Sequence, residues 1–235
     1  MLQPGNLELD ACTPDPLTPD GFNDHARLPY DCTLDHIRSA MQEFLNFLGF
    51  INMQLHTKDI ARLESMLIPA GFSSLVGEFF VSTLPRFSAG LAKNNYHNGH
   101  PDLVSAGMYP DNASQYGHLG IEVKASRYER GWQGHNAEES WLLILVYTAS
   151  RPSDKHKNVR PVPFRYDAVY GAQLERRDWT FSGRSSESRR TITASVNPTG
   201  YEKMVANWIY RRTTVLQDAE QVPLTDTAAA DAENG

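Results

Sequence analysis

Two short motifs, separated by nineteen residues, hold the side chains best suited to catalysis. Pro101-Asp102 opens one apolar run, and Glu122-Val123-Lys124 lies inside another. Side chains alternate between the two faces of a β-strand, so Glu122 and Lys124 share a face if their run is a strand. If the strand that begins at Asp102 is its neighbour, two carboxylates and an ammonium group meet. Such a group can hold a divalent cation against a phosphodiester and supply an activated water.

Each group has a place in such chemistry. The carboxylates of Asp102 and Glu122 and the carbonyl of Val123 are oxygen ligands of the kind that Mg²⁺ prefers. Lys124 can orient an attacking water, stabilise its hydroxide form and offset charge that builds up in the transition state. Both motifs are short and occur by chance, and a strand with one buried face can also carry its charges harmlessly in water.

A second Pro-Asp pair leaves the identity of the motif aspartate open. Pro110-Asp111 lies closer to Glu122, with ten residues between them. We favour Asp102, because an apolar Leu-Val pair continues it into a strand. Asp111 is instead followed by Asn-Ala-Ser, which is typical of a loop.

The helices around these motifs follow from the apolar periodicity. Thr33 is a suitable N-cap for a helix that ends near Gly49, and Thr57 is a suitable N-cap for a second. A third helix begins near Ser73 and ends before Pro85. Asn197-Pro198 starts a last helix whose inward-facing residues are Tyr201, Met204, Val205, Trp208 and Ile209.

Strands are expected between the third and the last helix. Short apolar or alternating runs predict them at residues 102–105, 119–125, 141–147, 164–174, 178–182 and 191–196. The run 141–147 is apolar throughout, which is typical of a strand buried on both faces. Helices followed by strands and a closing helix predict an α/β or α+β domain with a mixed sheet.

The 235 residues suit one large domain, or one domain with an arm. The Pro-rich residues 1–30 predict a poorly ordered N-terminal arm, residues 31–212 a single domain, and residues 213–235 an acidic, largely disordered tail. No apolar run approaches eighteen residues, so neither a transmembrane helix nor a membrane partner is expected. Two cysteines and no export signal indicate a cytoplasmic protein without a disulfide framework.

The charge is unevenly distributed along the chain. The net charge is −6, but residues 1–30 carry −4 and residues 213–235 carry −5, which leaves the middle of the chain positive. Residues 151–212 hold thirteen basic and six acidic residues. This segment can follow a phosphate backbone, although a solvated basic face explains it equally simply.

With these motifs the chain resembles the PD-(D/E)XK nuclease superfamily, which includes type II restriction endonucleases. The resemblance rests on Pro101-Asp102 and Glu122-Val123-Lys124, and the apolar run 141–147 fits the next core strand. It covers residues 73–150 and implies a mixed central sheet flanked by helices. Members often carry a further acidic residue on the preceding helix, and Glu78 matches that place.

The resemblance implies Mg²⁺-dependent hydrolysis of a DNA phosphodiester by in-line attack of water, with a 5′-phosphate and a 3′-hydroxyl as products. Mn²⁺ can substitute for Mg²⁺ in this chemistry. Asp102 and Glu122 match the metal ligands, joined by Val123 and Glu78, and Lys124 matches the catalytic lysine. We expect a restriction-type endonuclease that cuts duplex DNA as a homodimer, with a cognate DNA methyltransferase in the host.

Two groups of residues are candidates for DNA contact. The segment after Lys124 combines arginines, aromatic rings and amides: Ser126, Arg127, Tyr128, Arg130, Trp132, Gln133, His135 and Asn136. Basic residues near predicted strand ends form the second group: Arg176, Arg177, Arg184, Arg189 and Arg190. His97 and His100 lack further ligands at zinc spacing, so we interpret them as loop histidines. No nucleotide-binding or serine-hydrolase motif occurs, and no nucleotide cofactor is expected.

Three other functions fit parts of the same pattern. A repair or junction-resolving nuclease would use the same three groups on branched or nicked DNA. A non-catalytic DNA-binding protein would use the basic segments alone. A glycoside hydrolase would need two acids around a sugar-binding cleft, and the adjacent lysine disfavours it.

Overall fold

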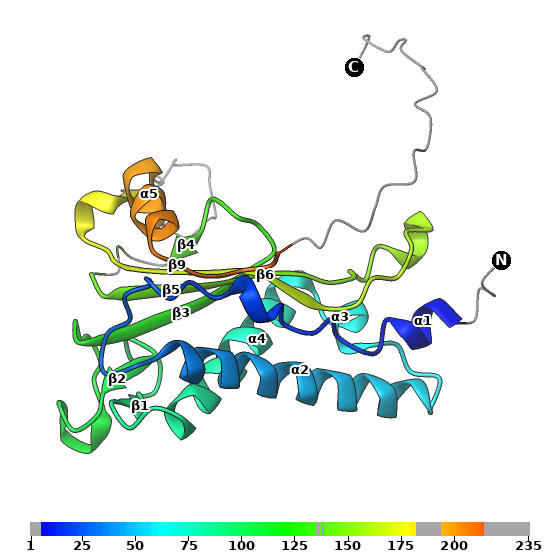
Figure 1. The fold of residues 1–235 in the computed structure, drawn as a ribbon, viewed down its shortest axis with the longest axis horizontal. Helices are drawn as coiled ribbons and strands as arrows, with labels where there is room; N and C mark the ends of the chain where they lie inside the picture. Colours follow the sequence, from blue (N-terminus) through cyan, green and yellow to red (C-terminus); the bar gives the residue numbers. More distant parts are fainter. Residues whose placement is uncertain (1–5, 135–136, 138, 182–193, 214–235) are drawn as a thin grey trace, which may run out of the picture.

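A six-stranded mixed sheet runs through the computed structural model, which describes residues 6–134, 137, 139–181 and 194–213 (Figure 1). Its strands, in spatial order, are β1 (Leu91–Lys93), β2 (Leu103–Ser105), β3 (Gly120–Ser126), β5 (Trp141–Thr148), β6 (Arg165–Gln173) and β9 (Trp208–Arg211). Neighbouring strands are antiparallel except β3 and β5, which are parallel. The predicted α/β class with a mixed central sheet is confirmed.

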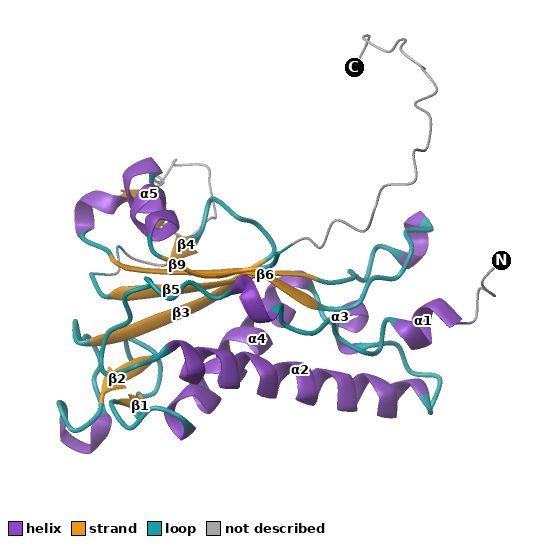
Figure 2. Cartoon of the chain, viewed as in Figure 1, coloured by secondary structure: helices purple, strands orange, loops and turns teal. Residues whose placement is uncertain are grey.

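Helices cover both faces of this sheet (Figure 2). They are α1 (Asn6–Asp10), α2 (Leu34–His56), α3 (Leu63–Met66), α4 (Pro69–Thr83) and α5 (Pro198–Ala206). The long α2 and α4 lie against one face, and α5 lies on the opposite face. In the part of the chain that the structure describes, no helix has both the length and the apolar composition needed to cross a membrane.

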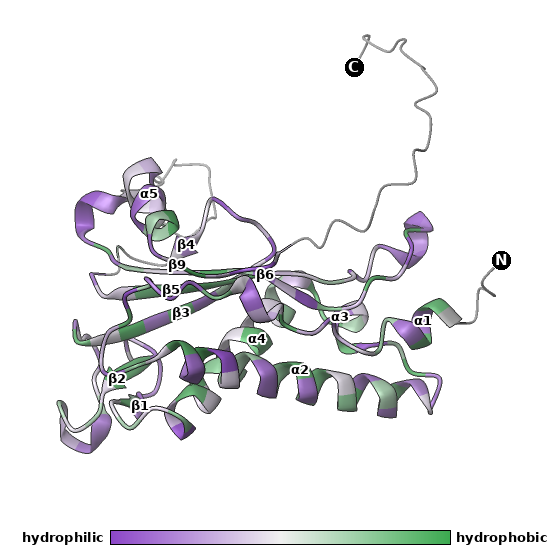
Figure 3. Cartoon of the chain, in the orientation of Figure 1, coloured by the Kyte–Doolittle hydropathy of each residue, from purple (hydrophilic) through white to green (hydrophobic). Residues whose placement is uncertain are grey.

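The central strand β5 is buried on both sides, as its apolar run predicts (Figure 3). Leu143, Leu145 and Tyr147 face a core that also contains residues of α2 and α4, such as Phe44 and Phe72. The alternate residues of β5 face a second core around α5, whose members include Leu142, Ile144, Val146 and Met204. Each face of the strand therefore has its own helical layer.

Some helix boundaries differ from the prediction. α2 continues past Gly49, because its buried stripe continues through Leu48 to Asn52. Thr57 is the C-cap of α2, and the second predicted helix is reduced to the four residues of α3. The last helix ends at Ala206, and the apolar residues after it form β9 beside β6.

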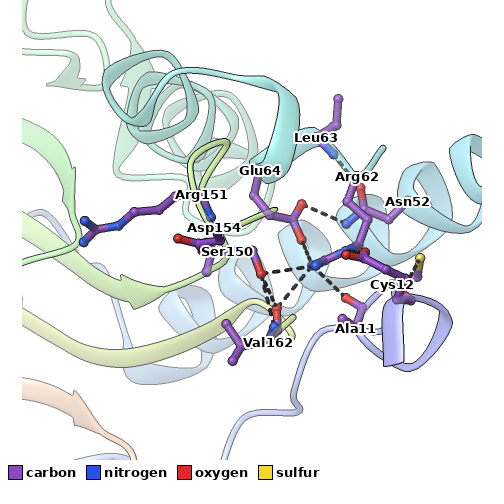
Figure 4. Close-up of polar contacts among 12 residues, drawn as sticks. Ala11, Cys12, Asn52, Arg62, Leu63, Glu64, Ser150, Arg151, Asp154 and Val162 are labelled. Atoms are coloured by element: carbon purple, nitrogen blue, oxygen red, sulfur yellow. Dashed lines mark hydrogen bonds and ion pairs between the residues drawn. The ribbon is translucent and has the colours of Figure 1, made fainter. Parts of the chain in front are cut away.

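The N-terminal segment also differs from the expected poorly ordered arm. Cys12 and Phe22 are buried, and Phe22 forms a β-bridge with Tyr210. Arg62, buried near the segment, binds the carboxylate of Glu8. It also binds the carbonyl of Ala11, as Figure 4 shows. Long-range contacts thus hold residues 6–30 despite their prolines. The predicted tail lies outside the described residues, except for residue 213.

The crossover from β3 to β5 contains a short strand and, within its described residues, no helix. Parallel neighbours need a crossover of a dozen or more residues, most often a helix. Here β4 (Gln133–Gly134) pairs with β8 (Ala194–Val196), which pairs with β7 (Trp179–Phe181). The crossover is therefore anchored in a second, three-stranded sheet, and this arrangement positions the residues that follow Lys124.

Candidate functional site

The pairing of β2 with β3 brings Asp102 to Glu122. Leu103 lies opposite Ile121 in the ladder, and Asp102 stands just before the first residue of β2. Its Oδ2 accepts a hydrogen bond of 2.9 Å from the backbone N–H of Val123. That N–H lies beyond the end of the ladder between β2 and β3, so a side chain takes the place of a strand partner. The backbone N–H of Asp102 in turn lies 3.3 Å from Oε2 of Glu122. The two carboxylates therefore lie side by side, as the motif predicts.

Two cationic or donor groups converge on the same carboxylate. Lys124 Nζ lies 2.8 Å from Oε1 of Glu122, and His100 Nδ1 lies 2.9 Å from its Oε2. Glu122 itself is 8% exposed. Alternation along β3 puts Glu122 and Lys124 on one face, so the three charged side chains of the two motifs share one place.

The two carboxyl groups have pKa values on opposite sides of their usual range. Burial, followed by the negative charge of Glu122, raises the pKa of Asp102 to about 7. Burial also acts to raise the pKa of Glu122, but the hydrogen bond from His100 and the charge of Lys124 outweigh it and lower the value to about 2. Near neutral pH a proton on Asp102 therefore competes with any cation bound there.

The donor set around the pair fits a hard divalent cation. Among the described residues, no three His, Cys, Asp or Glu side chains are grouped so that they could hold a metal ion. The Val123 carbonyl, which leaves the strand on the same edge as the N–H bound to Asp102, offers a third oxygen. Mg²⁺ is held in proteins by one or two carboxylates and keeps several waters, so two carboxylates and a carbonyl suffice.

Glu78 lies at the edge of this site. It belongs to α4, as predicted, and its charge contributes to the raised pKa of Asp102. Its carboxylate points toward Lys93, with Oε2 at 3.3 Å from Nζ, and the side chain is 68% exposed. To bind a metal ion, the Glu78 carboxylate would have to leave this ion pair. Its role as a metal ligand therefore stays a prediction.

A cleft of about 510 Å³ opens onto the acidic pair. Its walls come from α4 through Gly77 and Glu78, from β3 through Lys124, and from the crossover through Trp132 and Gln133. The predicted DNA-contacting segment therefore borders the candidate catalytic residues.

Two residues of the predicted DNA-contacting segment, Arg127 and Trp132, make hydrogen bonds within the protein. Arg127 donates hydrogen bonds to the carbonyls of Ala149 and Ser150, and its guanidinium lies 5.1 Å from the ring centre of Tyr147. Trp132 is 3% exposed and donates its indole N–H to the carbonyl of Tyr128. The Trp132 indole N–H and the two terminal nitrogens of Arg127 are thus engaged within the protein, while Arg127 Nε is buried and has no hydrogen-bond partner among the described residues.

The remaining DNA-contact predictions are spread over the molecule. Ser126 and Gln133 line the cleft, and Tyr128 and Arg130 are exposed next to it. Arg176 and Arg177 lie in a turn next to the second sheet, where Arg177 pairs with Glu175, and neither lines the cleft. The other predicted contacts lie outside the described residues: His135, Asn136, Arg184, Arg189 and Arg190.

The alternative aspartate is far less suited to the motif. Asp111 lies exposed in the turn Pro110–Asn112, and its backbone carbonyl accepts a hydrogen bond from Asn95. Asp102, not Asp111, is the residue that the structure brings to Glu122.

His100 is the site residue that the sequence analysis missed. It was interpreted as a loop histidine, yet its ring hydrogen-bonds the carboxylate of Glu122. Its position two residues before Asp102 was the one local signal, since the contact with Glu122 depends on the pairing of β2 with β3.

Replacing His100 with alanine is expected to raise the pKa of Glu122, since a donor to its ionised form is lost. Any binding of Mg²⁺ at the pair should then be about tenfold weaker, with a larger difference at pH 6 than at pH 8. A calorimetric Mg²⁺ titration at both pH values measures this. His97→Ala, in the same loop, is the matched control and should leave the titration unchanged.

No family model matches the chain, and neither a curated protein nor a solved structure matches it. The function is therefore argued from the site itself.

Proposed function

We propose that the protein is a Mg²⁺-dependent endonuclease of the PD-(D/E)XK type that hydrolyses phosphodiester bonds in duplex DNA. The observation that supports this proposal is the meeting of Asp102, Glu122 and Lys124 at the mouth of one cleft. Burial, followed by the negative charge of Glu122, disfavours the ionised Asp102 carboxylate when no cation is bound, and the raised pKa of Asp102 expresses that cost. A site that carries such a cost is a candidate for function.

Each side chain has a defined task in this proposal. Asp102, Glu122 and the Val123 carbonyl would hold Mg²⁺, which supplies an activated water and neutralises charge on the phosphoryl group. Lys124 orients the attacking water and offsets charge in the transition state. His100 keeps Glu122 ionised, because its hydrogen bond favours the charged carboxylate.

The finer assignment is part of the same proposal. We place the protein with restriction-type enzymes of the cytoplasm, acting on duplex DNA as a homodimer and accompanied by a DNA methyltransferase. A twofold dimer would bring one such centre to each strand of a symmetric site.

Lys124→Ala is expected to lower the rate of plasmid cleavage by about 10²- to 10⁴-fold, the usual contribution of a positioned acid or base. The assay compares Mg²⁺, Mn²⁺ and EDTA, with sequencing of the new ends. Lys58→Ala, an exposed lysine after α2, is the matched control and should retain full activity.

Cleavage that survives both EDTA and Lys124→Ala would refute the proposal. Defined fragments would support a restriction-type enzyme. Cleavage confined to branched or nicked DNA would instead identify a repair nuclease.

A further inference from the structure

Three hollows adjoin one another along α4. The cleft at the acidic pair shares Glu78, Val81 and Asp102 with a hollow of about 480 Å³ next to the loop Asn94–Gly99. At its other end it shares Ser73, Ala125 and Ser126 with a hollow of about 220 Å³. They form one groove, and the candidate catalytic pair lies in its middle.

The smallest hollow differs in charge from the middle of the groove. Its lining contains two arginines, Arg127 and Arg151, and no acidic residue. The hydroxyl-bearing residues Ser73, Ser126 and Tyr128 complete the polar part of the lining. The Ser126 hydroxyl already donates to the carbonyl of Tyr128, and the Ser73 hydroxyl bonds the hydroxyl of Tyr147. Arginines without a competing carboxylate are the chemistry that binds a phosphate group.

Arg151 is the arginine of this hollow that is available to a ligand. Arg127 is held by two backbone carbonyls and by the Tyr147 ring. Arg151 is exposed, and its side chain takes part in no ion pair among the described residues. Figure 4 shows its guanidinium directed away from the buried group around Arg62. Asp154, the nearest acid in the chain, accepts a hydrogen bond from the Arg151 backbone N–H.

The chain after Arg151 extends the positive charge. Residues 151–160 contain four basic residues and one acidic residue, and all four basic side chains are exposed. A single small anion would need only the hollow. A polyanion could use the hollow and this loop together, while another of its phosphates lies at Asp102.

We propose that the hollow at Arg151 is a phosphate subsite that binds the DNA backbone beside the scissile phosphate. This inference rests on the proposed function and adds the path of the substrate strand. Ser126 lies two residues beyond Lys124 on β3, about 7 Å along the strand. Because a DNA strand winds around the helix axis, its successive phosphates lie farther apart than the axial rise of about 3.4 Å per nucleotide, so the subsite receives a phosphate next to the scissile one.

The test measures binding of a duplex oligonucleotide in EDTA, where no cleavage occurs, by fluorescence anisotropy at several salt concentrations. Arg151→Ala should weaken binding by about tenfold and reduce the slope of log K against log salt by about 1. Arg86→Ala is the matched control, because Arg86 is exposed but lies outside the three hollows, and it should change neither quantity.

A second measurement locates the contact. Once the cut position is known, a neutral methylphosphonate at the phosphate next to the scissile one, tested on each side, should weaken binding by the native protein on one side. The same replacement should have little further effect on Arg151→Ala, because the contact is already lost.

The outcomes separate this inference from the proposed function. An unchanged salt slope in Arg151→Ala would overturn the subsite, even if the protein cuts DNA. A reduced slope in a protein that never cuts DNA would support the subsite and refute the nuclease. The absence of DNA binding by the native protein in EDTA would overturn the subsite, while the cleavage assay with Mg²⁺ decides the nuclease separately.

Discussion

Replacing Asp102 with asparagine is expected to abolish DNA cleavage and, at pH 8, to stabilise the metal-free protein. The asparagine can still accept the hydrogen bond from the Val123 N–H, but it carries no charge next to Glu122. A site that loses a metal ligand should lose at least about 10³-fold in activity. Removal of the poorly solvated Asp102 charge, and of its repulsion by Glu122, should stabilise the fold by about 2 kcal/mol, roughly half of the full linkage value because solvent screens the site.

The gain in stability depends on pH in a defined direction. The pKa of Asp102 is about 7 in the folded protein, against an ordinary value of 3.8. Between pH 3.8 and about pH 7, Asp102 is protonated in the folded protein but ionised in the unfolded chain. The folded state therefore binds more protons, and rising pH in this range destabilises it. The advantage of Asp102→Asn should therefore be small near pH 4, grow up to pH 7 and stay constant above it.

Urea unfolding in EDTA at pH 4 and pH 8 measures this difference. Asp111→Asn is the matched control, because that carboxylate is exposed in a turn, and it should change neither stability nor cleavage. Equal or lower stability of Asp102→Asn at pH 8 would contradict the proposed repulsion between the two carboxylates.

Replacing Arg62 with methionine is expected to destabilise the protein by about 3–5 kcal/mol. Arg62 is 2% exposed and pairs with Glu64, which is 0% exposed. Its other donors bind Ser150 and the carbonyl of Val162, as Figure 4 shows. Without Arg62, the carboxylate of Glu64 would stay buried with only the amide of Asn52 as its partner in the network shown.

The double variant Arg62→Met, Glu64→Leu distinguishes a lost ion pair from lost packing. Because it removes both charges, it should recover much of the stability that the single variant loses. Arg177→Met, in the exposed pair with Glu175, is the matched control and should cost at most about 0.5 kcal/mol. Chemical unfolding at pH 7 measures all three, and a double variant as unstable as Arg62→Met would contradict the electrostatic explanation.

The sequence was most informative where local patterns decide the structure. Alternation along β3 predicts the shared face of Glu122 and Lys124, and the apolar run predicts β5. Thr33 and Asn197 are N-caps as their types suggest. These features depend on residues only a few positions apart.

Other features depend on partners far away in the chain. Trp208 belongs to β9 because β6 offers an edge for pairing, and nothing in the local pattern shows that edge. Arg127 has the composition of a DNA contact, but the carbonyls that hold it lie more than twenty residues away. His100 becomes a site residue only when β2 pairs with β3.

The crossover from β3 to β5 links the position of the six-stranded sheet to that of the three-stranded sheet. The Val196 N–H on β8 donates to the carbonyl of Trp132, and β4 pairs with the same strand at Gln133. One wall of the groove, at Trp132 and Gln133, therefore belongs to the small sheet. A substitution in β8 that breaks its pairing with β4 is expected to displace Gln133 from the cleft, although β8 lies far from the two acids in the sequence.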